Sequence, residues 1–261
     1  MITSMQNQQI KDVVKLYVDS RERRKQNLFV IEGLREFSLA LVGGYDILKL
    51  FVCNDFLSQK GKELVSGIDI PVEKVAAEGF QKMAYREKSE GIIALAAARH
   101  VSLSELQLSA TPFIIVLEAV EKPGNLGAIL RTADAAGVDA VIVCDPQTDI
   151  YNPNTIRSSL GCVFTRQVVV CTCKEALQWL KEADIRVFAA ALSASEYYHN
   201  VDFKRPSAIV MGTETNGLTD FWLRNADSLI KIPMRGAIDS LNVSVSTAIL
   251  TFEAMRQRNL I

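Results

Sequence analysis

Short, continuously apolar segments recur through the second part of the chain, and most are followed by a stretch with the composition of a helix. Because these segments do not alternate between polar and apolar residues, they are typical of strands that are covered on both faces. Strands that alternate with helices in this way predict an α/β domain with a mainly parallel sheet flanked by helices. The expected strands begin near Phe113, Asp139, Arg166, Arg186, Ser207 and Ser228, and the expected helices cover residues 125–136, 153–160, 174–183 and 218–225 and the end of the chain.

A parallel sheet directs attention to one of its edges. Ligands of such sheets bind outside the carboxyl ends of the strands. Three loops are therefore candidates for the functional site, namely those that follow Val120, Met211 and Met234.

The first part of the chain shows the same alternation on a smaller scale. Strands are expected over residues 28–33, 47–53, 71–76 and 91–97, and helices over 34–44 and 58–66, after a first helix that runs from about Ile10 into the basic stretch SRERRKQ. A polar, serine-rich connector, RHVSLSELQLSATP, follows these elements. We therefore expect a small α/β domain over residues 1–99, a linker over 100–110 and the parallel-sheet domain over 111–261.

The composition excludes several classes of protein. The chain is 49% hydrophobic and 23% charged, and it shows neither an apolar run long enough to cross a bilayer nor a signal peptide at its start. We therefore expect a cytoplasmic protein with no membrane partner. Because the net charge is −1, any contact with a nucleic acid must come from local basic patches.

Cysteine and histidine give no indication of metal or redox chemistry. The five cysteines include no C-x-x-C pair, and Cys171 and Cys173 would place both sulfur atoms on one face of an expected strand. We interpret the cysteines as reduced core residues. The two histidines, His100 and His199, are far apart in the sequence. Neither a metal site nor a histidine-dependent triad is expected.

The first candidate loop reads EKPGNLGAILRTADAAG. Gly124 and Gly127 permit close approach of the backbone, and Asn125 is expected to cap the helix that follows. A capped helix does not explain Arg131, which lies almost two turns further on among apolar positions. This residue is therefore a candidate for chemistry.

The second candidate loop reads IVMGTETNGLT and contains Gly212, Glu214 and Gly217. A glycine-rich turn between strand and helix indicates nucleotide binding, but the G-x-G-x-x-G pattern is absent, and an acidic residue is unfavourable beside a phosphate. These features favour a nucleoside ligand without a phosphate. The alternative is a tight turn in which Thr219 or Asn216 caps the next helix.

The third candidate loop belongs to IPMRGAIDSLNVSVSTAILTFEAMRQR, residues 232–258. Three polar residues, Asn242, Ser244 and Ser246, stand at the start of an otherwise apolar helix. Packing of the helix against a core does not explain three polar side chains at this position.

These three stretches resemble, in the same order, the three signature motifs of the SpoU (TrmH-like) family of RNA ribose 2'-O-methyltransferases, within the SPOUT superfamily. The resemblance covers essentially all of residues 111–261. The stretches LFVIEGLREFSLAL and SEGIIALA are similar to the substrate-binding domain of the family, an α/β fold like that of kink-turn-binding ribosomal proteins. The first domain is accordingly expected to bind the RNA substrate.

The resemblance implies a fold and a set of site residues that composition and spacing do not reveal. The last segment of the chain would thread through a loop to form a deep trefoil knot, and S-adenosylmethionine would lie bent in this knot. The implied cofactor residues are Leu117, Gly212, Glu214, Ile232, Met234, Leu241 and Asn242. The implied catalytic residues are Arg131, which is central, and Asn125, Glu214, Ser240 and Asn242, which support it.

The chemistry of Arg131 leaves two mechanisms open, because an arginine is normally protonated and is a poor general base. In one mechanism Arg131 accepts the proton of the ribose hydroxyl. In the other it stays cationic, binds the neighbouring phosphate and stabilises the forming alkoxide. Physical reasoning favours the second.

The expected substrate is ribosomal RNA. Transfer RNA, methylation of a base and a non-catalytic RNA-binding or ribosome-assembly role are the alternatives. Contact with the RNA is assigned to Arg131 and to a basic cluster that comprises Arg21, Arg23, Arg24 and Lys25. The alternative interpretation of this cluster is a solvated helix end.

The family resemblance further implies a homodimer. In the last helix, Leu250 and Ala254 lie at helical spacing and are available for the interface, or else for the core of the same chain.

Overall fold

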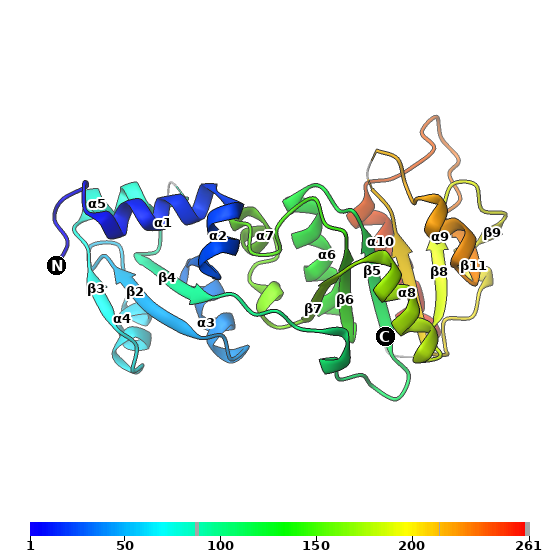
Figure 1. The fold of residues 1–261 in the computed structure, drawn as a ribbon, viewed down its shortest axis with the longest axis horizontal. Helices are drawn as coiled ribbons and strands as arrows, with labels where there is room; N and C mark the ends of the chain where they lie inside the picture. Colours follow the sequence, from blue (N-terminus) through cyan, green and yellow to red (C-terminus); the bar gives the residue numbers. More distant parts are fainter. Residues whose placement is uncertain (87–88, 214, 259–261) are drawn as a thin grey trace. The chain divides into compact units, whose positions relative to one another are not determined.

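The structure is a computed structural model that describes residues 1–86, 89–213 and 215–258. The chain forms two compact units (Figure 1). The first comprises Met1–Arg99 together with Asp149–Thr165, and the second comprises His100–Thr148 together with the chain from Arg166 onward. Each unit has its own sheet and its own core.

The first unit contains a four-stranded mixed sheet with the strand order β1-β4-β2-β3. β4 runs antiparallel to both of its neighbours, and β2 and β3 are parallel. All four strands were expected from the sequence. Their bounds are β1 Leu28–Glu32, β2 Ile47–Val52, β3 Val72–Lys74 and β4 Ile92–Ala97.

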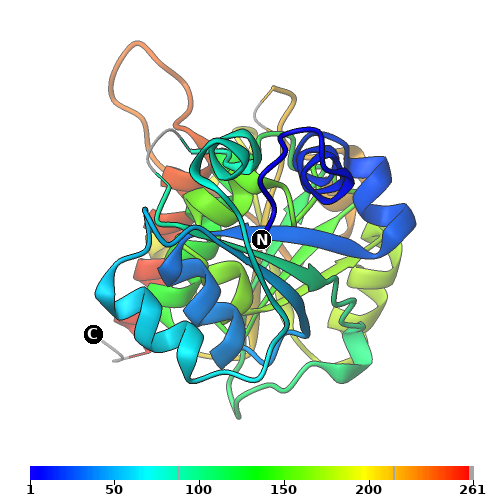
Figure 2. The same ribbon diagram turned by 90° about the vertical axis from the view of Figure 1, so that its left-hand side faces the viewer.

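Helices cover both faces of this sheet. α1 and α5 lie together on one side of it, and α3 and α4 lie on the other (Figure 2). The side of α1 and α5 holds a buried apolar cluster that includes Ile10, Leu16 and Phe80. The helices are α1 Gln8–Val18, α2 Ser20–Gln26, α3 Leu34–Val42, α4 Gln59–Ser66, α5 Ala77–Met83 and α7 Pro153–Ser158.

The first helix is shorter than the sequence predicted. It ends at Asp19, whose backbone is extended, and a separate helix α2 begins directly afterwards. The carboxylate of Asp19 accepts hydrogen bonds from the backbone N–H groups of Arg21 and Glu22. Because this is the contact that starts a helix, Asp19 divides the predicted helix into two.

The compact units differ from the predicted domains in two respects. Residues 100–110, the predicted linker, belong to the second unit, and residues 149–165 belong to the first. The sequence placed this segment, with the helix α7, inside the second domain, but it packs within the first unit. The ring of Tyr151 stacks on Phe29 with 4.2 Å between the centroids, and Asp149 forms an ion pair with Arg23. A helical pattern reveals that such a segment is a helix but not which core its apolar face contacts.

The second unit contains a seven-stranded sheet with the order β7-β6-β5-β10-β8-β11-β9. All its strand pairs are parallel. The predicted parallel α/β fold is therefore confirmed. The strands are β5 Phe113–Glu118, β6 Ala140–Cys144, β7 Gln167–Cys171, β8 Arg186–Ala190, β9 Glu196–Tyr197, β10 Ser207–Met211 and β11 Ser228–Lys231.

Alternate residues of the central strands face two different helical layers. Ile114 and Val116 of β5 belong to a buried cluster with residues of α8 and α9. The residues between them point to the opposite face of the sheet. The helices α6 and α10 pack against each other and contribute no residue to that cluster. The bounds are α6 Pro123–Ala136, α8 Cys173–Glu182, α9 Asp220–Asn225 and α10 Val243–Gln257.

In the described part of the chain, no helix has both the length and the apolar character that a membrane crossing requires.

Candidate functional site

The loops after β5 and β10 leave the sheet side by side. The two strands are neighbours, and Leu117 near the end of β5 pairs with Met211 at the end of β10. β11 runs parallel to them on the other side of β8, so its carboxyl end lies at the same edge. The topology therefore brings the three candidate loops to one edge of one sheet, as the sequence predicted.

Asn125 does not cap the helix α6, contrary to the prediction. The helix begins earlier, at Pro123, and the N-cap position is held by Lys122 without a side-chain hydrogen bond. Proline is favoured at the first position of a helix because its ring already has the required φ angle. Asn125 thus lies within the first turn, and its Oδ1 accepts a hydrogen bond from Nδ2 of Asn242, at 3.1 Å.

Asn242 is the N-cap of the helix α10. Its Oδ1 accepts hydrogen bonds from the backbone N–H of Ser244 at 2.9 Å and from the hydroxyl of Ser244 at 2.6 Å. Its Nδ2 donates to Asn125, so one side-chain amide both starts α10 and ties it to the first turn of α6. The polar start of the last helix is thus a junction between two of the three predicted motifs.

Arg131 lies on α6, six residues after Asn125, which corresponds to about 9 Å along the helix axis. Its side chain is exposed, although Leu130 and Ile129 beside it are fully buried. Within the described residues Arg131 forms no ion pair. A guanidinium in this state can bind an anionic ligand without first leaving an internal partner.

The second loop is closed on itself. The backbone N–H of Thr213 donates to the carbonyl of Gly217 at 3.0 Å, and the N–H of Gly217 donates back at 3.1 Å. A Cβ atom at Gly212 would lie 2.1 Å from the backbone of Gly217, so only glycine fits at this position. Glu214, a predicted catalytic and cofactor residue, lies outside the described residues.

Sequence reasoning missed Glu118, the last residue of β5, which is only 4% exposed. Its carboxylate accepts hydrogen bonds from the backbone N–H of Thr219 at 2.8 Å and from the hydroxyl of Thr219 at 2.6 Å. Thr219 occupies the N-cap of α9 but makes no side-chain cap of its own. The alternative interpretation of this loop, in which the side chain of Thr219 or Asn216 caps the next helix, is not observed, because α9 has no side-chain cap and the hydroxyl of Thr219 is bound to Glu118.

The third loop, residues 232–241, has neither helix nor strand and projects from the sheet as the long loop before α10 (Figure 1). Ile232 and Met234 are half-buried, whereas Ser240 and Leu241 are exposed. The hydroxyl of Ser240 donates to Oδ1 of Asp239 at 3.2 Å. The structure thus joins Asn125 to Asn242 directly, and it gives Ser240 a local partner.

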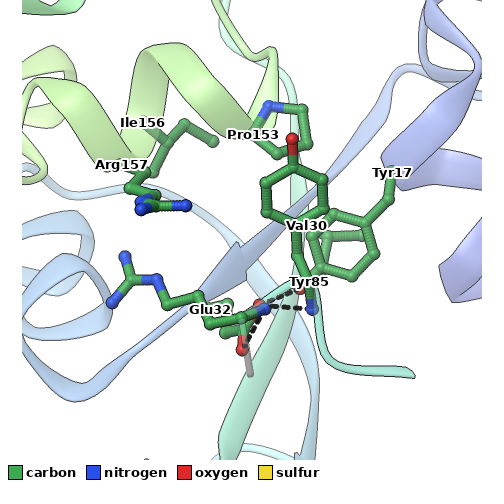
Figure 3. A pocket seen from close by; sticks show the side chains of 8 residues that line it. Tyr17, Val30, Glu32, Tyr85, Pro153, Ile156 and Arg157 are labelled. Atoms are coloured by element: carbon green, nitrogen blue, oxygen red, sulfur yellow. Dashed lines mark hydrogen bonds between the residues drawn. The ribbon is translucent and has the colours of Figure 1, made fainter. Parts of the chain in front are cut away.

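A small cavity lies in the first unit, and none of the residues that line it belongs to the three candidate loops (Figure 3). Its volume of about 10 Å³ is room for roughly one water molecule, which is too small for a nucleoside. The residues that line it are Tyr17, Val30, Glu32, Tyr85, Arg86, Pro153, Ile156 and Arg157.

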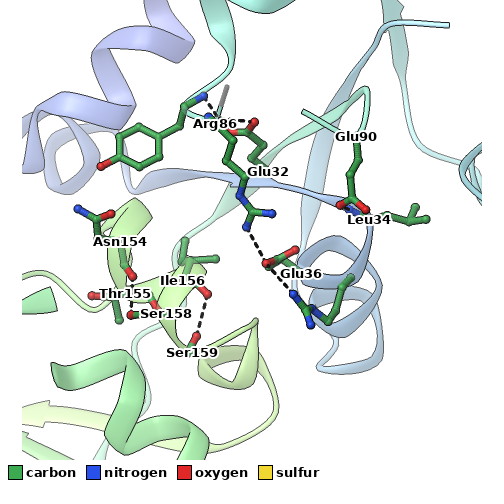
Figure 4. Close-up of polar contacts among 12 residues, drawn as sticks. Glu32, Leu34, Glu36, Arg86, Glu90, Asn154, Thr155, Ile156, Ser158 and Ser159 are labelled. Atoms are coloured by element: carbon green, nitrogen blue, oxygen red, sulfur yellow. Dashed lines mark hydrogen bonds and ion pairs between the residues drawn. The ribbon is translucent and has the colours of Figure 1, made fainter. Parts of the chain in front are cut away.

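A buried carboxylate beside this cavity organises the loop after α5. Glu32 accepts hydrogen bonds from the hydroxyl of Tyr17 at 3.3 Å and from the backbone N–H of Tyr85 at 2.8 Å. Burial, together with the neighbouring Glu32, raises the pKa of Tyr17 well above its ordinary value. Arg86 completes the group by an ion pair of 2.6 Å with Glu36 (Figure 4). We interpret this cluster as structural, because each of these side chains is bound to another part of the unit.

The predicted basic cluster on α2 is divided by burial. Arg23 is 4% exposed, and its guanidinium contacts Asp149 at 2.6 Å and the carbonyl of Leu16 at 2.6 Å. It therefore holds the unit together and has no free face for RNA. Three members of the cluster remain exposed, namely Arg21, Arg24 and Lys25.

Leu250 and Ala254 are fully buried within the chain. The intramolecular alternative for these two residues is thus the correct one. The exposed apolar side chains of the last segment are others, among them Leu241, Val245 and Phe252.

The cysteines are free thiols, as expected. The neighbouring thiols of Cys171 and Cys173, together with burial, raise the pKa of Cys144. Within the described ranges, no group of three or more histidine, cysteine or carboxylate side chains is arranged to hold a metal ion.

Similarity to known protein families covers both parts of the chain. Residues 112–252 match the SpoU rRNA Methylase family, and residues 7–94 match the MRM3-like substrate binding domain. The chain is 32% identical to the 23S rRNA (guanosine(2553)-2'-O)-methyltransferase RlmP of Bacillus subtilis (strain 168), over 96% of this chain and 97% of that protein. It is 36% identical to the 23S rRNA (guanosine-2'-O-)-methyltransferase RlmB of Bordetella pertussis, over 72% of this chain and 78% of that protein.

Solved structures give the same result. An RNA 2'-O ribose methyltransferase is 37% identical, with a TM-score of 0.86 and coverage of 99% of both chains. An AdoMet-bound rRNA methyltransferase from Sinorhizobium meliloti is 29% identical, with a TM-score of 0.90 and coverage of 98% of this chain and 97% of that one.

Proposed function

The chain belongs to the SpoU rRNA Methylase family, and on that premise we propose that it transfers the methyl group of S-adenosylmethionine to a ribose 2'-hydroxyl of 23S ribosomal RNA. The observation that carries this proposal is the junction of Asn125 and Asn242, which joins two motif-bearing helices at the carboxyl edge of the sheet. Relatives that match this chain along nearly its whole length carry the name of this reaction. Family membership also implies the deep trefoil knot.

The described residues at this edge have the kinds of group that could bind S-adenosylmethionine. Gly212 presents its backbone directly after β10, and Ile232 and Met234 present partly exposed apolar side chains suited to an adenine ring. We assign cofactor binding to these residues with Leu117, Glu214, Leu241 and Asn242. When bound, S-adenosylmethionine supplies a methyl group on a sulfonium, which is already a good leaving group.

The task of the protein is to make the ribose hydroxyl a better nucleophile. Arg131 stays cationic, binds the phosphate beside the ribose and stabilises the negative charge that develops on the 2'-oxygen. The N-terminus of α10 lies at Asn242, and the partial positive charge of a helix N-terminus acts in the same direction. The amides of Asn125 and Asn242 and the hydroxyl of Ser240 hold the ribose in position, and the carboxylate of Glu214 receives the proton of the 2'-hydroxyl.

The proposal is tested by incubating the protein with methyl-labelled S-adenosylmethionine and with unmodified 23S ribosomal RNA or transfer RNA in separate reactions. The RNA is then hydrolysed with alkali. A 2'-O-methylated ribose cannot attack its own phosphodiester, so the label is expected in alkali-resistant dinucleotides from the 23S reaction. Label in mononucleotides would indicate base methylation, label only in transfer RNA would change the substrate, and no label with intact RNA binding would indicate a non-catalytic factor.

We assign recognition of the RNA to the first unit and to the three exposed basic residues of α2, which are Arg21, Arg24 and Lys25. Each contact between a lysine or arginine and a phosphate releases a counterion, so the affinity should depend on salt. Substitution of all three by glutamine should weaken RNA binding and reduce the salt slope. An unchanged slope would favour the alternative of a solvated helix end.

We propose that the active form is a homodimer that uses the exposed apolar side chains of α10, which are Val245 and Phe252. Apolar side chains at helical spacing on an exposed face are typical of an interface. Sedimentation at low micromolar concentration should give a dimer, and Phe252→Glu should shift it toward the monomer. A wild-type monomer under these conditions would contradict the proposal.

We place the enzyme in the cytoplasm, since ribosomal RNA is its proposed substrate, and cell fractionation tests this placement.

A further inference from the structure

The carboxylate of Glu118 is an unusual feature of the parallel sheet. β5 is a central strand whose other residues are apolar and buried, yet its last residue is a glutamate that is 4% exposed. Burial of a carboxylate is costly unless its oxygens are satisfied by hydrogen bonds. Within the described residues Glu118 forms no ion pair, so hydrogen bonds alone must stabilise it.

The contacts of this carboxylate with the described residues lie on the side of α8 and α9. Oε2 accepts from the backbone N–H of Thr219, and Oε1 accepts from its hydroxyl. Oε1 also lies 3.6 Å from Sγ of Cys173, the first residue of α8. Leu117, one residue earlier in β5, points to the opposite face because side chains alternate along a strand.

These contacts fix both ends of the second loop to consecutive residues of one strand. The loop begins after Met211, which pairs with Leu117, and it ends at Thr219, which is bound to Glu118. Between these points lie Gly212 and the hydrogen-bonded pair of Thr213 and Gly217. The position of the turn at the carboxyl edge therefore depends on the end of β5.

A second set of contacts holds the helix that follows the loop. The indole N–H of Trp222, a fully buried residue of α9, donates to Sγ of Cys173 at 3.3 Å. The same sulfur atom contacts Glu118. Glu118, Cys173, Thr219 and Trp222 thus form one connected network at the start of α8 and α9.

We infer that Glu118 is a positioning residue for methyl transfer, which holds Gly212, Thr213 and Gly217 of the second loop in the position that binds S-adenosylmethionine. The inference rests on the proposed function, because that function makes this loop part of the cofactor site. Glu118 does not itself contact the reacting atoms. Its loss should therefore raise the KM and Kd for S-adenosylmethionine, and it should leave the KM for RNA and the kcat at saturating cofactor nearly unchanged.

The test uses Glu118→Gln in the full-length protein, because glutamine keeps the shape but offers one acceptor oxygen in place of two. We expect the Kd for S-adenosylmethionine, measured by calorimetry, to rise about tenfold or more, the factor that corresponds to loss of a charge-assisted hydrogen bond. Thr219→Val removes only the hydroxyl contact and should raise the Kd by a smaller factor in the same direction.

Asp139→Asn is the matched control. Its carboxylate accepts hydrogen bonds from the backbone N–H groups of Ser109 and Phe113, at the opposite edge of the same sheet. This substitution should lower the melting temperature without changing the Kd for S-adenosylmethionine.

The outcomes separate the inference from the proposed function. If Glu118→Gln and Thr219→Val lower the melting temperature as Asp139→Asn does but leave the Kd and KM for the cofactor unchanged, Glu118 is merely structural and the inference is wrong. If Glu118→Gln does not fold, the Kd of Thr219→Val decides in the same way. If the wild-type protein neither binds S-adenosylmethionine nor methylates RNA, the proposed function itself fails.

Discussion

Replacement of Asn242 by aspartate separates the two contacts that its side-chain amide makes. Oδ1 accepts the hydrogen bond from the backbone N–H of Ser244 at 2.9 Å, and Nδ2 donates to Asn125 at 3.1 Å. An aspartate keeps the first contact, and its negative charge is favourable at the N-terminus of a helix. It cannot donate, so the second contact becomes an approach of two acceptors.

The expected effects on stability and activity therefore differ. Asn242→Asp should leave the free energy of unfolding within about 0.3 kcal/mol of wild type, because aspartate and asparagine cap helices about equally well. Asn242→Ala loses the cap and should cost about 1 kcal/mol, or roughly 2–4 °C in melting temperature for a chain of this size. Both substitutions break the bond to Asn125, so kcat should fall by about tenfold or more in both.

Thermal unfolding followed by circular dichroism measures the first quantity, and initial rates of methyl transfer to 23S ribosomal RNA measure the second. Asn125→Ala is the control, because it breaks the same bond from the other side and leaves the cap of α10 intact. Wild-type kcat in Asn242→Asp would refute the role of the junction. A melting temperature as low as that of Asn242→Ala would refute the account of the cap.

Three further predictions follow from single side chains. Arg131→Lys keeps the charge but not the planar fork of donors, so kcat should fall by about tenfold or more; near-full activity would favour a general base at this position. Arg23→Ala removes the ion-pair partner of the largely buried Asp149 and should lower the free energy of unfolding by about 3 kcal/mol. Arg24→Ala, on the surface, should change it by less than about 0.5 kcal/mol. Equal effects of the two substitutions in urea unfolding would contradict the structural role of Arg23. Burial, with Glu32 beside it, raises the pKa of Tyr17. The stability linked to the neutral phenol is therefore complete below about pH 10, and it is lost as the pH rises through the pKa of the folded state. Tyr17→Phe should unfold at a higher pH than wild type, and an unchanged pH midpoint of alkaline unfolding would contradict this prediction.

The elements of the fold follow from local patterns, and their partners do not. The strands of both sheets and most of the helices are readable because apolar runs and helical spacing are properties of neighbouring residues. The place of residues 149–165 is not readable in this way, since the stacking of Tyr151 on Phe29 joins residues far apart in the chain. The end of the first helix at Asp19 had a local signal, an acidic residue followed by a serine, but a continuous basic helix was the simpler interpretation.

The same distinction applies to the site. Motif resemblance selected Asn125, Arg131 and Asn242, and the topology brings the loops that carry them to one edge of the sheet. The bond between Asn125 and Asn242 could not be predicted, because it depends on how α6 and α10 pack. The burial of Arg23 was missed for the same reason, since a basic run gives no sign that one of its members faces inward.

Glu118 is the exception, because the sequence does carry a signal for it. A central strand of a parallel sheet is covered by helices on both faces, so a carboxylate in such a strand cannot reach water by turning to the other side. It must find buried donors, and the donors nearest to the carboxyl end of a strand are the N–H groups that begin the adjacent loops and helices. A single acidic residue that closes an otherwise apolar parallel strand therefore indicates a hydrogen bond to a neighbouring loop. In this chain that loop is the one proposed to hold the cofactor.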